Sequence, residues 1–232
     1  MARLETIPVQ AGTVRVAFTA RRDGDLRVDA DPGGLATLRR RVVDAPWTWL
    51  RQVHGADVVV VTEPGEWSGA EADGAVTTAA GCPLAVTTAD CAPVVLAADR
   101  GVAVVHAGWR GLVAGIVEEA ARKLAGVGGG APVATLLGPC ISPAAYEFGP
   151  DDLALVEARL GPTVRSTTNW GAHALDVPAA VAVACDRAGW PRPDVVPPCT
   201  SDDQWFSHRV RRDPGRQATV AWLVADPTPG GA

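Results

Sequence analysis

The chain has 232 residues, of which 47% are hydrophobic and 20% charged, and its formal net charge is −5. This composition supplies a core for one large or two small domains and excludes disorder for most of the chain. The acidity is mild, and no Lys- or Arg-rich run alternates with aromatic residues. Nucleic-acid and membrane surfaces are therefore disfavoured, and small molecules are the expected partners.

The sequence contains no segment that is typical of a secretion signal or a membrane span. The first ten residues have no apolar stretch, and apolar runs elsewhere are interrupted by Asp, Arg or Gly before they reach about 20 residues. Five cysteines, an odd number with no CxxC pair, indicate thiols in a reducing compartment. We therefore expect a cytoplasmic protein.

Runs rich in Val and Thr predict strands along most of the chain. In chain order, the strands are expected at Thr13–Thr19, Asp57–Thr62, Leu84–Thr88, Val94–Ala98, Val102–His106, Val133–Gly138 and Gln217–Val224. Leu84–Thr88 and Val102–Val105 are continuous apolar runs, which is the pattern of strands buried on both faces.

Helical periodicity appears between these strands. One continuous helix is predicted from Gly108 to Gly126, because its apolar residues recur on one face and a glycine follows them. Two further helices are expected at Asp151–Leu160, which has an acidic start, and from Asp176 as N-cap to Gly189.

Short neighbouring strands ahead of the helices predict an α+β or mixed α/β class with mixed sheets, rather than a strict βαβ repeat. The sequence shows no fixed-period repeat and no long linker, so we expect a single domain over residues 1–225. The Pro- and Gly-rich end at 226–232 is predicted to be a disordered tail.

His54, Cys91 and His106 are the candidate metal ligands. His54 precedes a predicted strand, and Cys91 and His106 each lie at the end of an apolar strand. Two imidazoles and a thiolate would fill three zinc positions and leave the fourth for water or substrate, as in catalytic zinc sites. Spacing alone also allows the alternative of a buried cysteine and two hydrogen-bonded histidines. Asp90, beside Cys91, could orient a histidine behind the metal or cap a turn.

Other candidate residues surround these three. Gly108 and Arg110 begin the predicted helix, where free N–H groups and a guanidinium favour an anion such as phosphate. Arg209 follows an aromatic pair and could close over an anionic ligand. Cys140 could be a second thiol near the site, although a small buried apolar side chain is the simpler interpretation.

Five segments, QVHGADV, TTADCAPVVL, VVHAGWRGL, GPCISPAAYEFG and FSHR, resemble a known family in order and separation. This family was once named multicopper polyphenol oxidase or laccase-domain proteins and is now described as purine nucleoside phosphorylases. The resemblance covers about Gln52 to Leu223. It implies a layered αββα fold with mixed sheets, and zinc bound by His54, Cys91 and His106. It also implies phosphorolysis of adenosine and inosine, with adenosine deamination and methylthioadenosine cleavage as companion activities.

The chain departs from the family pattern in two places. Family members usually carry Gly-Gly-Val-Ser, Ser-Leu-Asn-Leu and Asn-Arg segments in the N-terminal part, where this chain has RRDGDLRVDADPGGLATLRRRV. The usual Phe-Ser-Tyr-Arg is here Phe206-Ser207-His208-Arg209. Both departures indicate altered substrate contacts.

Three other functions are compatible with these residues. A metal-free hydrolase or deamidase would use Cys91 as a nucleophile activated by His106. A copper phenol oxidase would need more ligands than four histidines provide, so copper is disfavoured relative to zinc. A non-catalytic sensor of metal or nucleoside would keep the pocket without turnover.

Overall fold

Two mixed five-stranded sheets pack face to face in the computed structural model, which describes residues 2–226. Sheet I has the order β1 (Arg3–Val9), β2 (Gly12–Phe18), β12 (Gln217–Ala225), β6 (Leu84–Thr88) and β3 (Thr48–Trp49). Sheet II has the order β4 (Val58–Val61), β5 (Gly74–Thr77), β8 (Gly101–Ala107), β7 (Ala92–Ala98) and β9 (Pro132–Leu137). The pairs β3–β6 and β4–β5 are parallel and the others antiparallel, so the predicted mixed sheets are confirmed.

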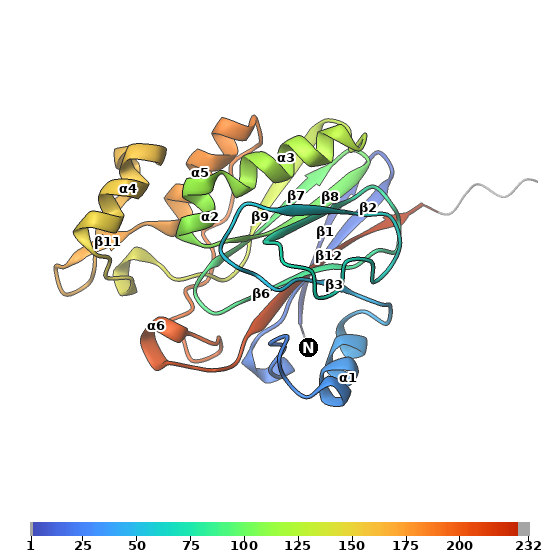
Figure 1. Ribbon diagram of the computed structural model, residues 1–232, viewed down its shortest axis with the longest axis horizontal. Coiled ribbons are helices and arrows are strands. Elements are labelled where there is room, and N and C mark those ends of the chain that lie inside the picture. The colour runs from blue at the N-terminus through green and yellow to red at the C-terminus, as the bar shows by residue number, and fades with distance from the viewer. Residues whose placement is uncertain (1, 227–232) are drawn as a thin grey trace, which may run out of the picture.

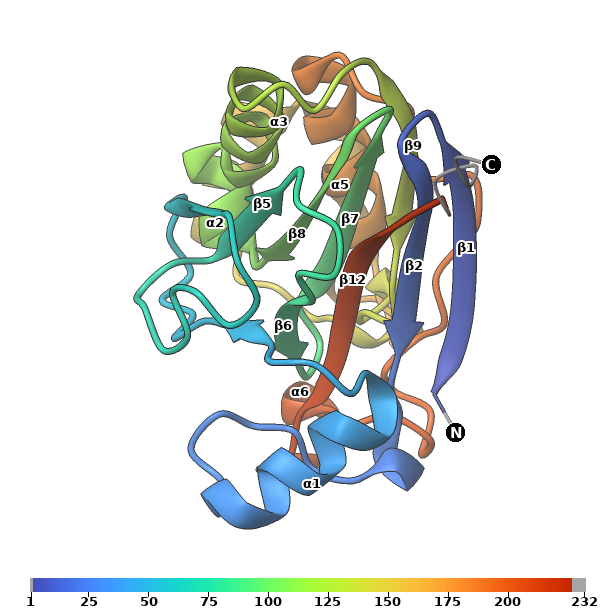
Figure 2. The ribbon, with the colours of Figure 1, turned by 90° about the vertical axis from the view of Figure 1, so that its right-hand side faces the viewer.

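Helices cover the two outer faces of this sandwich (Figure 1). On the side of sheet II lie α2 (Trp109–Ala114), α3 (Ile116–Gly126), α4 (Pro150–Leu160) and α5 (Val177–Ala188). On the side of sheet I lies α1 (Pro32–Val42), and a one-turn helix α6 (His208–Arg211) lies near the lower edge in Figure 2. The remaining pair, β10 (Arg165–Thr167) and β11 (His173–Leu175), forms a separate hairpin. The arrangement is the expected αββα layering.

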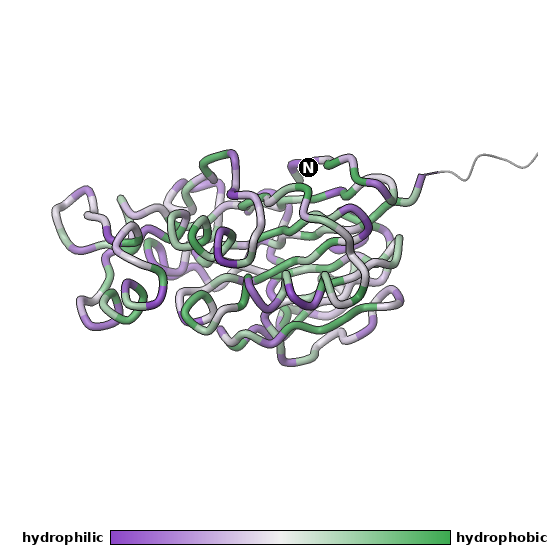
Figure 3. The backbone as a smooth tube through the Cα atoms, turned by 90° about the horizontal axis from the view of Figure 1, so that it is seen from above, coloured by the Kyte–Doolittle hydropathy of each residue, from purple (hydrophilic) through white to green (hydrophobic). Residues whose placement is uncertain are grey.

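The alternation of side chains in the central strands produces two apolar layers. In β7, Val95 and Ala97 pack between the sheets, whereas Val94 and Leu96 pack against the helices. β8 divides its side chains in the same way, and every residue of both strands is buried. The prediction that Val102–Val105 is buried on both faces is confirmed. Figure 3 shows the hydrophobic segments running through the middle of the molecule.

The prediction of one continuous helix from Gly108 to Gly126 is wrong at Gly115, where the helix is interrupted. Gly115 adopts a left-handed conformation, with φ of 88°, and its N–H donates to carbonyls of the preceding turn. The chain therefore forms two helices, α2 and α3, that meet at this residue. Apolar periodicity continues across the break because both helices pack on sheet II, so the pattern alone predicted one helix.

Strand β1, helix α1 and strand β5 were missing from the sequence-based prediction. Helix α1 contains two glycines and three arginines but is defined by Pro32 in its first turn and by Asp31, which accepts a hydrogen bond from Gly34. No helix within residues 2–226 is long and apolar enough to cross a membrane. The predicted tail at 226–232 lies, apart from Asp226, outside the described residues.

Candidate functional site

His54, Cys91 and His106 meet at one end of sheet II. Strands β7 and β8 are antiparallel, with Pro93 opposite His106, so Cys91, which directly precedes β7, lies beside the end of β8. His54 approaches from the loop that follows β3, and the potential ligand atoms of the three residues all lie within 4.8 Å of one another. Within the described chain, this is the one group of His, Cys, Asp or Glu side chains placed to hold a metal.

Asp73, which the sequence analysis missed, fixes both histidines. Its carboxylate is fully buried and accepts hydrogen bonds from the backbone N–H groups of Val53, His54 and Gly55, at 3.1, 3.0 and 2.8 Å. The same carboxylate lies 2.7 Å from Nδ1 of His106. In the neutral ring, this contact favours the proton on Nδ1 and leaves Nε2 of His106 free to bind a metal.

The loop that carries His54 is held by a second side chain. The Gln52 amide bonds both backbone groups of Thr87 in β6, with Nε2 donating to the carbonyl and Oε1 accepting from the N–H, each at 2.8 Å. His54 itself has a φ of 61°, which is rare for a residue with a Cβ. Because Gln52 and Asp73 hold the loop on both sides of Val53, this unusual conformation is maintained by the surrounding structure.

Gly108 lies directly against the three candidate ligands. A Cβ at this position would be 2.8 Å from Cδ2 of His54 and 3.5 Å from Sγ of Cys91. The first distance is too short for a carbon–carbon contact, so any side chain here would displace the His54 ring. The sequence analysis associated Gly108 with phosphate, but its clearest structural role is to leave room for the side chains of the candidate ligands.

The charges of Cys91 and His106 stabilise each other. Burial on its own would raise the pKa of the Cys91 thiol, but the nearby His106 and the hydrogen bonds of both histidines lower that pKa below its usual value. Burial would lower the pKa of His106, whereas the Cys91 thiolate and the Asp73 carboxylate raise it. The favoured form of Cys91 is therefore the thiolate, which is both a metal ligand and a nucleophile.

All three candidate ligands line a cleft of about 590 Å³. Trp109, Arg110 and Tyr146 line it as well. The Arg110 guanidinium stacks on the Trp109 ring at 4.3 Å from its centroid, and it has no acidic partner among residues 2–226. Arg110 therefore lines the cleft without an ion-pair partner in the described part of the chain. The first helix after Gly108 has only six residues, so its dipole is smaller than that of the long helix expected here.

Of the two roles expected for Asp90, its contacts fit that of a cap at the start of a helix rather than that of a histidine partner. Its carboxylate accepts hydrogen bonds from Oγ1 of Thr200 at 2.6 Å, Oγ of Ser207 at 2.7 Å and the backbone N–H of Arg209 at 2.6 Å. The carboxylate that contacts a histidine is that of Asp73. Asp90 instead ties the segment before Cys91 to helix α6, and its φ of 94° turns the chain at this point.

Arg209 lines the cleft, as does Arg216 from the same part of the chain. The Arg209 guanidinium lies 4.9 Å from the Tyr146 ring centroid. Cys140 is buried and pairs with Cys199 in an isolated β-bridge. It does not belong to the group of potential metal ligands, and burial raises the pKa of its thiol strongly. The structure thus brings Arg209 to the cleft and keeps Cys140 behind it.

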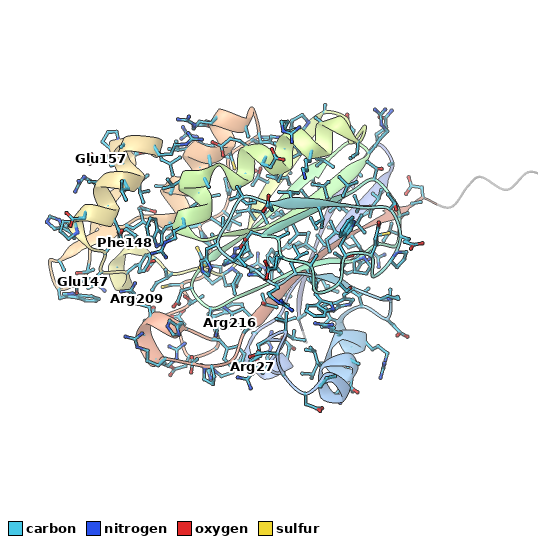
Figure 4. The ribbon with its side chains drawn as sticks, viewed as in Figure 1. Arg27, Glu147, Phe148, Glu157, Arg209 and Arg216 are labelled. Carbon is cyan, nitrogen blue, oxygen red and sulfur yellow. The ribbon has the colours of Figure 1, made fainter. Side chains whose placement is uncertain are left out.

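Part of the cleft wall is formed by residues that the sequence analysis did not predict. Arg27, Val28 and Asp29 from the segment before α1 line it, and Figure 4 shows Arg27 and Arg216 near each other there. The guanidinium Nε of Arg27 lies 3.2 Å from the Asp25 carboxylate. This segment is where the sequence departs from the family pattern, so the departure lies in the wall of the cleft.

Known proteins similar to this chain share its fold and much of its sequence. A purine nucleoside phosphorylase of Streptomyces coelicolor is 39% identical over 207 residues, covering 84% of this chain and 85% of that protein. A purine nucleoside phosphorylase of Xylella fastidiosa is 40% identical over 195 residues, covering 75% of this chain and 71% of that protein. The crystal structure of YlmD from Geobacillus stearothermophilus has a TM-score of 0.79 at 26% identity, covering 90% of this chain and 91% of the other.

The family described as multi-copper polyphenol oxidoreductase laccase matches residues 19–224. This range contains every candidate site residue discussed above. The chain therefore belongs to this family.

Proposed function

We propose that this chain is a cytoplasmic, zinc-dependent purine nucleoside phosphorylase that converts adenosine and inosine to the free base and ribose 1-phosphate. Adenosine deamination and methylthioadenosine phosphorolysis are proposed as side activities of the same site. The observation that carries the proposal is the convergence of His54, Cys91 and His106 in a cleft, in a chain whose relatives are named purine nucleoside phosphorylases.

The donor set fits zinc. Two imidazoles and a thiolate are the ligand types of zinc sites, and three protein ligands leave a position for water or substrate. Asp73 accepts the hydrogen bond from the ring nitrogen of His106 that would not bind the metal, as is usual for metal-binding histidines. Gly108 leaves the space beside the candidate ligands that a Cβ would fill. When bound, zinc would act as a Lewis acid and lower the pKa of a water molecule.

Copper oxidase chemistry, which the family description suggests, fits less well. The other two histidines of the chain, His173 and His208, lie outside the group of potential ligands. A multinuclear copper site needs several more imidazoles than this group offers.

In the proposed phosphorolysis, a phosphate oxygen bonds to C1′ of the ribose while the C1′–N9 bond breaks. The bonding electrons leave with the purine, which takes up a proton. Arg110 is the residue we assign to phosphate, because its charge has no acidic partner in the described chain and a guanidinium binds phosphate oxygens in pairs. Trp109 and Tyr146 offer aromatic surface in the same cleft.

In the proposed deamination, water adds to C6 of the purine and ammonia leaves. Together with His54, His106 and Cys91 would hold the zinc at this end of the cleft. Asp73 would keep His106 in one orientation and tautomer. Phosphate takes no part in this reaction. Its rate is therefore expected to be independent of Arg110.

One observation favours a second candidate, a metal-free cysteine hydrolase or deamidase. Cys91, His106 and Asp73 are arranged as thiol, imidazole and carboxylate, with Nδ1 of His106 2.7 Å from Asp73 and the Cys91 pKa lowered. This is the order of groups in a nucleophile–base–carboxylate triad. The two candidates share residues but differ in their response to a chelator.

The decisive experiment incubates metal-analysed protein with adenosine, inosine and methylthioadenosine, with and without phosphate and chelator, and identifies the products. The proposal expects ribose 1-phosphate from inosine only when phosphate is present, and loss of this product after chelation.

His106→Ala should abolish metal binding and both activities. Arg110→Gln should raise the KM for phosphate by about 10-fold or more, from the loss of a charged hydrogen bond. Arg122→Gln, a change on the exposed face of α3, is its control. Activity that survives complete metal removal would favour the cysteine hydrolase instead.

A further inference from the structure

A second cavity, of about 690 Å³, adjoins the cleft lined by the candidate metal ligands His54, Cys91 and His106, which we call the metal cleft. Arg209 lines both. We call it the Trp170 pocket and define it by Glu147, Phe148, Trp170, His173, Arg209 and Val210. Figure 4 shows Glu147, Phe148 and Arg209 close together between α4 and α6. Neither the proposed phosphorolysis nor the proposed deamination uses this cavity. Its volume falls in the range of small-molecule sites, about 300–1,000 Å³.

Trp170 is presented to this pocket by a rigid turn. It stands at the tip of the β10–β11 hairpin, where Gly171 N–H donates to the Thr168 carbonyl at 3.0 Å and Thr168 N–H donates to the Ala172 carbonyl at 2.9 Å. Its indole N–H donates to the Glu147 carboxylate at 2.9 Å, although the residue is 59% exposed. The ring is therefore held in place before any ligand arrives, which lowers the entropy cost of stacking on it.

The remaining surface of the pocket favours an uncharged planar ligand. Phe148 is buried behind it, whereas Val210 is 48% exposed. The Glu147 carboxylate is already bonded to Trp170, and the Arg209 guanidinium stacks on Tyr146 and donates to the Glu147 carbonyl at 3.3 Å. Because both groups already have partners, aromatic and aliphatic area is the main binding surface left, and His173 also lines the pocket.

The pocket is connected to the metal site through one residue. The backbone N–H of Arg209 bonds the Asp90 carboxylate, and Asp90 directly precedes the candidate ligand Cys91. The Arg209 side chain reaches Tyr146, which lines the metal cleft. A ligand that fills the Trp170 pocket would therefore contact a guanidinium that also borders the substrate.

We propose that the Trp170 pocket binds a second purine ring, as free base or nucleoside, stacked on the Trp170 indole. The choice of a purine rests on the proposed function, which places this ring type in the neighbouring cleft as substrate and product. An aromatic ring of that size matches an immobilised, exposed indole better than an ion or an aliphatic chain does.

The test is an equilibrium titration with hypoxanthine, read by tryptophan fluorescence and by calorimetry in the absence of phosphate. The wild type is expected to bind two equivalents. Trp170→Ala is expected to bind one, with affinity at the second site reduced at least 10-fold. Val210→Asp, which places a charge on the same surface, should have the same effect without removing the indole.

Trp67→Ala is the matched control. Trp67 is also an exposed indole, at 51%, with its N–H bonded to the Val60 carbonyl, and it lines neither cavity. It should leave both sites intact. One equivalent of bound hypoxanthine in every protein, or two in the Trp170 and Val210 variants, would overturn the inference.

The experiment measures binding rather than turnover, so it can contradict this inference without contradicting the proposed function. A chain that lacks phosphorolysis but binds hypoxanthine through Trp170 would keep this inference and lose the function. The opposite result would keep the function alone. Sedimentation of the same variants tests whether a second copy of the chain occupies this pocket instead. The inference would be overturned if the wild type is a dimer, Trp170→Ala is a monomer, and no hypoxanthine binds at this pocket.

Discussion

The two sides of the metal cleft are built in different ways. His54, Cys91 and His106 lie on or beside the buried strands of sheet II, and Asp73 bonds the backbone or ring of both histidines. The opposite side consists of loop segments around Arg27 and Arg216, whose side chains are partly exposed. Under the proposed function, the reacting groups would be fixed by the core of the fold, whereas the substrate would be contacted by loops that can change without disturbing them.

The strongest test of this comparison is Asp73→Asn. An amide replaces one acceptor oxygen by a donor, which then opposes a backbone N–H of the His54 loop or weakens the contact with His106. We expect metal affinity to fall about 10–100-fold and activity to fall with it. Stability is expected to drop by about 1–3 kcal/mol, from an unsatisfied buried donor. Zinc titration and urea unfolding measure the two effects.

Asp176→Ala is the control for Asp73→Asn. Asp176 caps helix α5 by accepting a hydrogen bond from Ala179 at 2.9 Å, away from the cleft. Its loss should cost about 1 kcal/mol of stability while metal affinity stays at the wild-type value. An equal loss of metal affinity in both variants would mean that general destabilisation, rather than positioning by Asp73, sets the affinity.

Gly108→Ala tests how closely the ligands are packed. The added Cβ would meet the His54 ring at 2.8 Å, so His54 must move away from Cys91 and His106. We expect metal affinity to fall about 10-fold, as for a lost positioning contact. Gly126→Ala, at a helical position with no atom within 4 Å of the new Cβ, should leave the affinity unchanged and raise stability by up to about 1 kcal/mol. Equal metal affinity in the two variants would show that the ligand group tolerates a shift of His54.

Alkylation with iodoacetamide tests the state of Cys91. With metal bound, Cys91 should be protected, and chelation should expose it. Its lowered pKa of about 6 keeps it as thiolate, so the rate in chelated protein should change by less than about twofold between pH 8.5 and 7.5. A thiol of ordinary pKa would slow about fivefold over the same interval. Peptide mapping separates Cys91 from Cys199, and equal rates with and without chelator would argue for the metal-free nucleophile.

The sequence predicted the three residues that meet in the candidate site better than it predicted the elements that support them. The buried strands around Cys91 and His106 were recognisable from continuous apolar runs, and the three candidate ligands follow from residue type and strand ends together with the family motifs. Asp73 was missed because strand β5, which it precedes, has only four residues and no clear alternation. The sequence left two roles open for Asp90, because its partners, Thr200, Ser207 and Arg209, are more than 100 residues away in the chain. Contacts at that separation leave no local pattern.

The smallest expected effect is that of Arg27→Gln, on the loop side of the cleft. The Arg27 side chain is 39% exposed, and its guanidinium is near both Asp25 and Asp29, so the change removes a solvent-screened charge and little packing. We expect a change of about two- to fivefold in the KM for adenosine relative to inosine, because one partly exposed contact contributes up to about 1 kcal/mol. Metal affinity and the alkylation rate of Cys91 should stay at wild-type values. A loss of metal affinity comparable to that of Asp73→Asn would mean that the two sides of the cleft are coupled, and that the loop segment helps to hold the ligands as well as to contact the substrate.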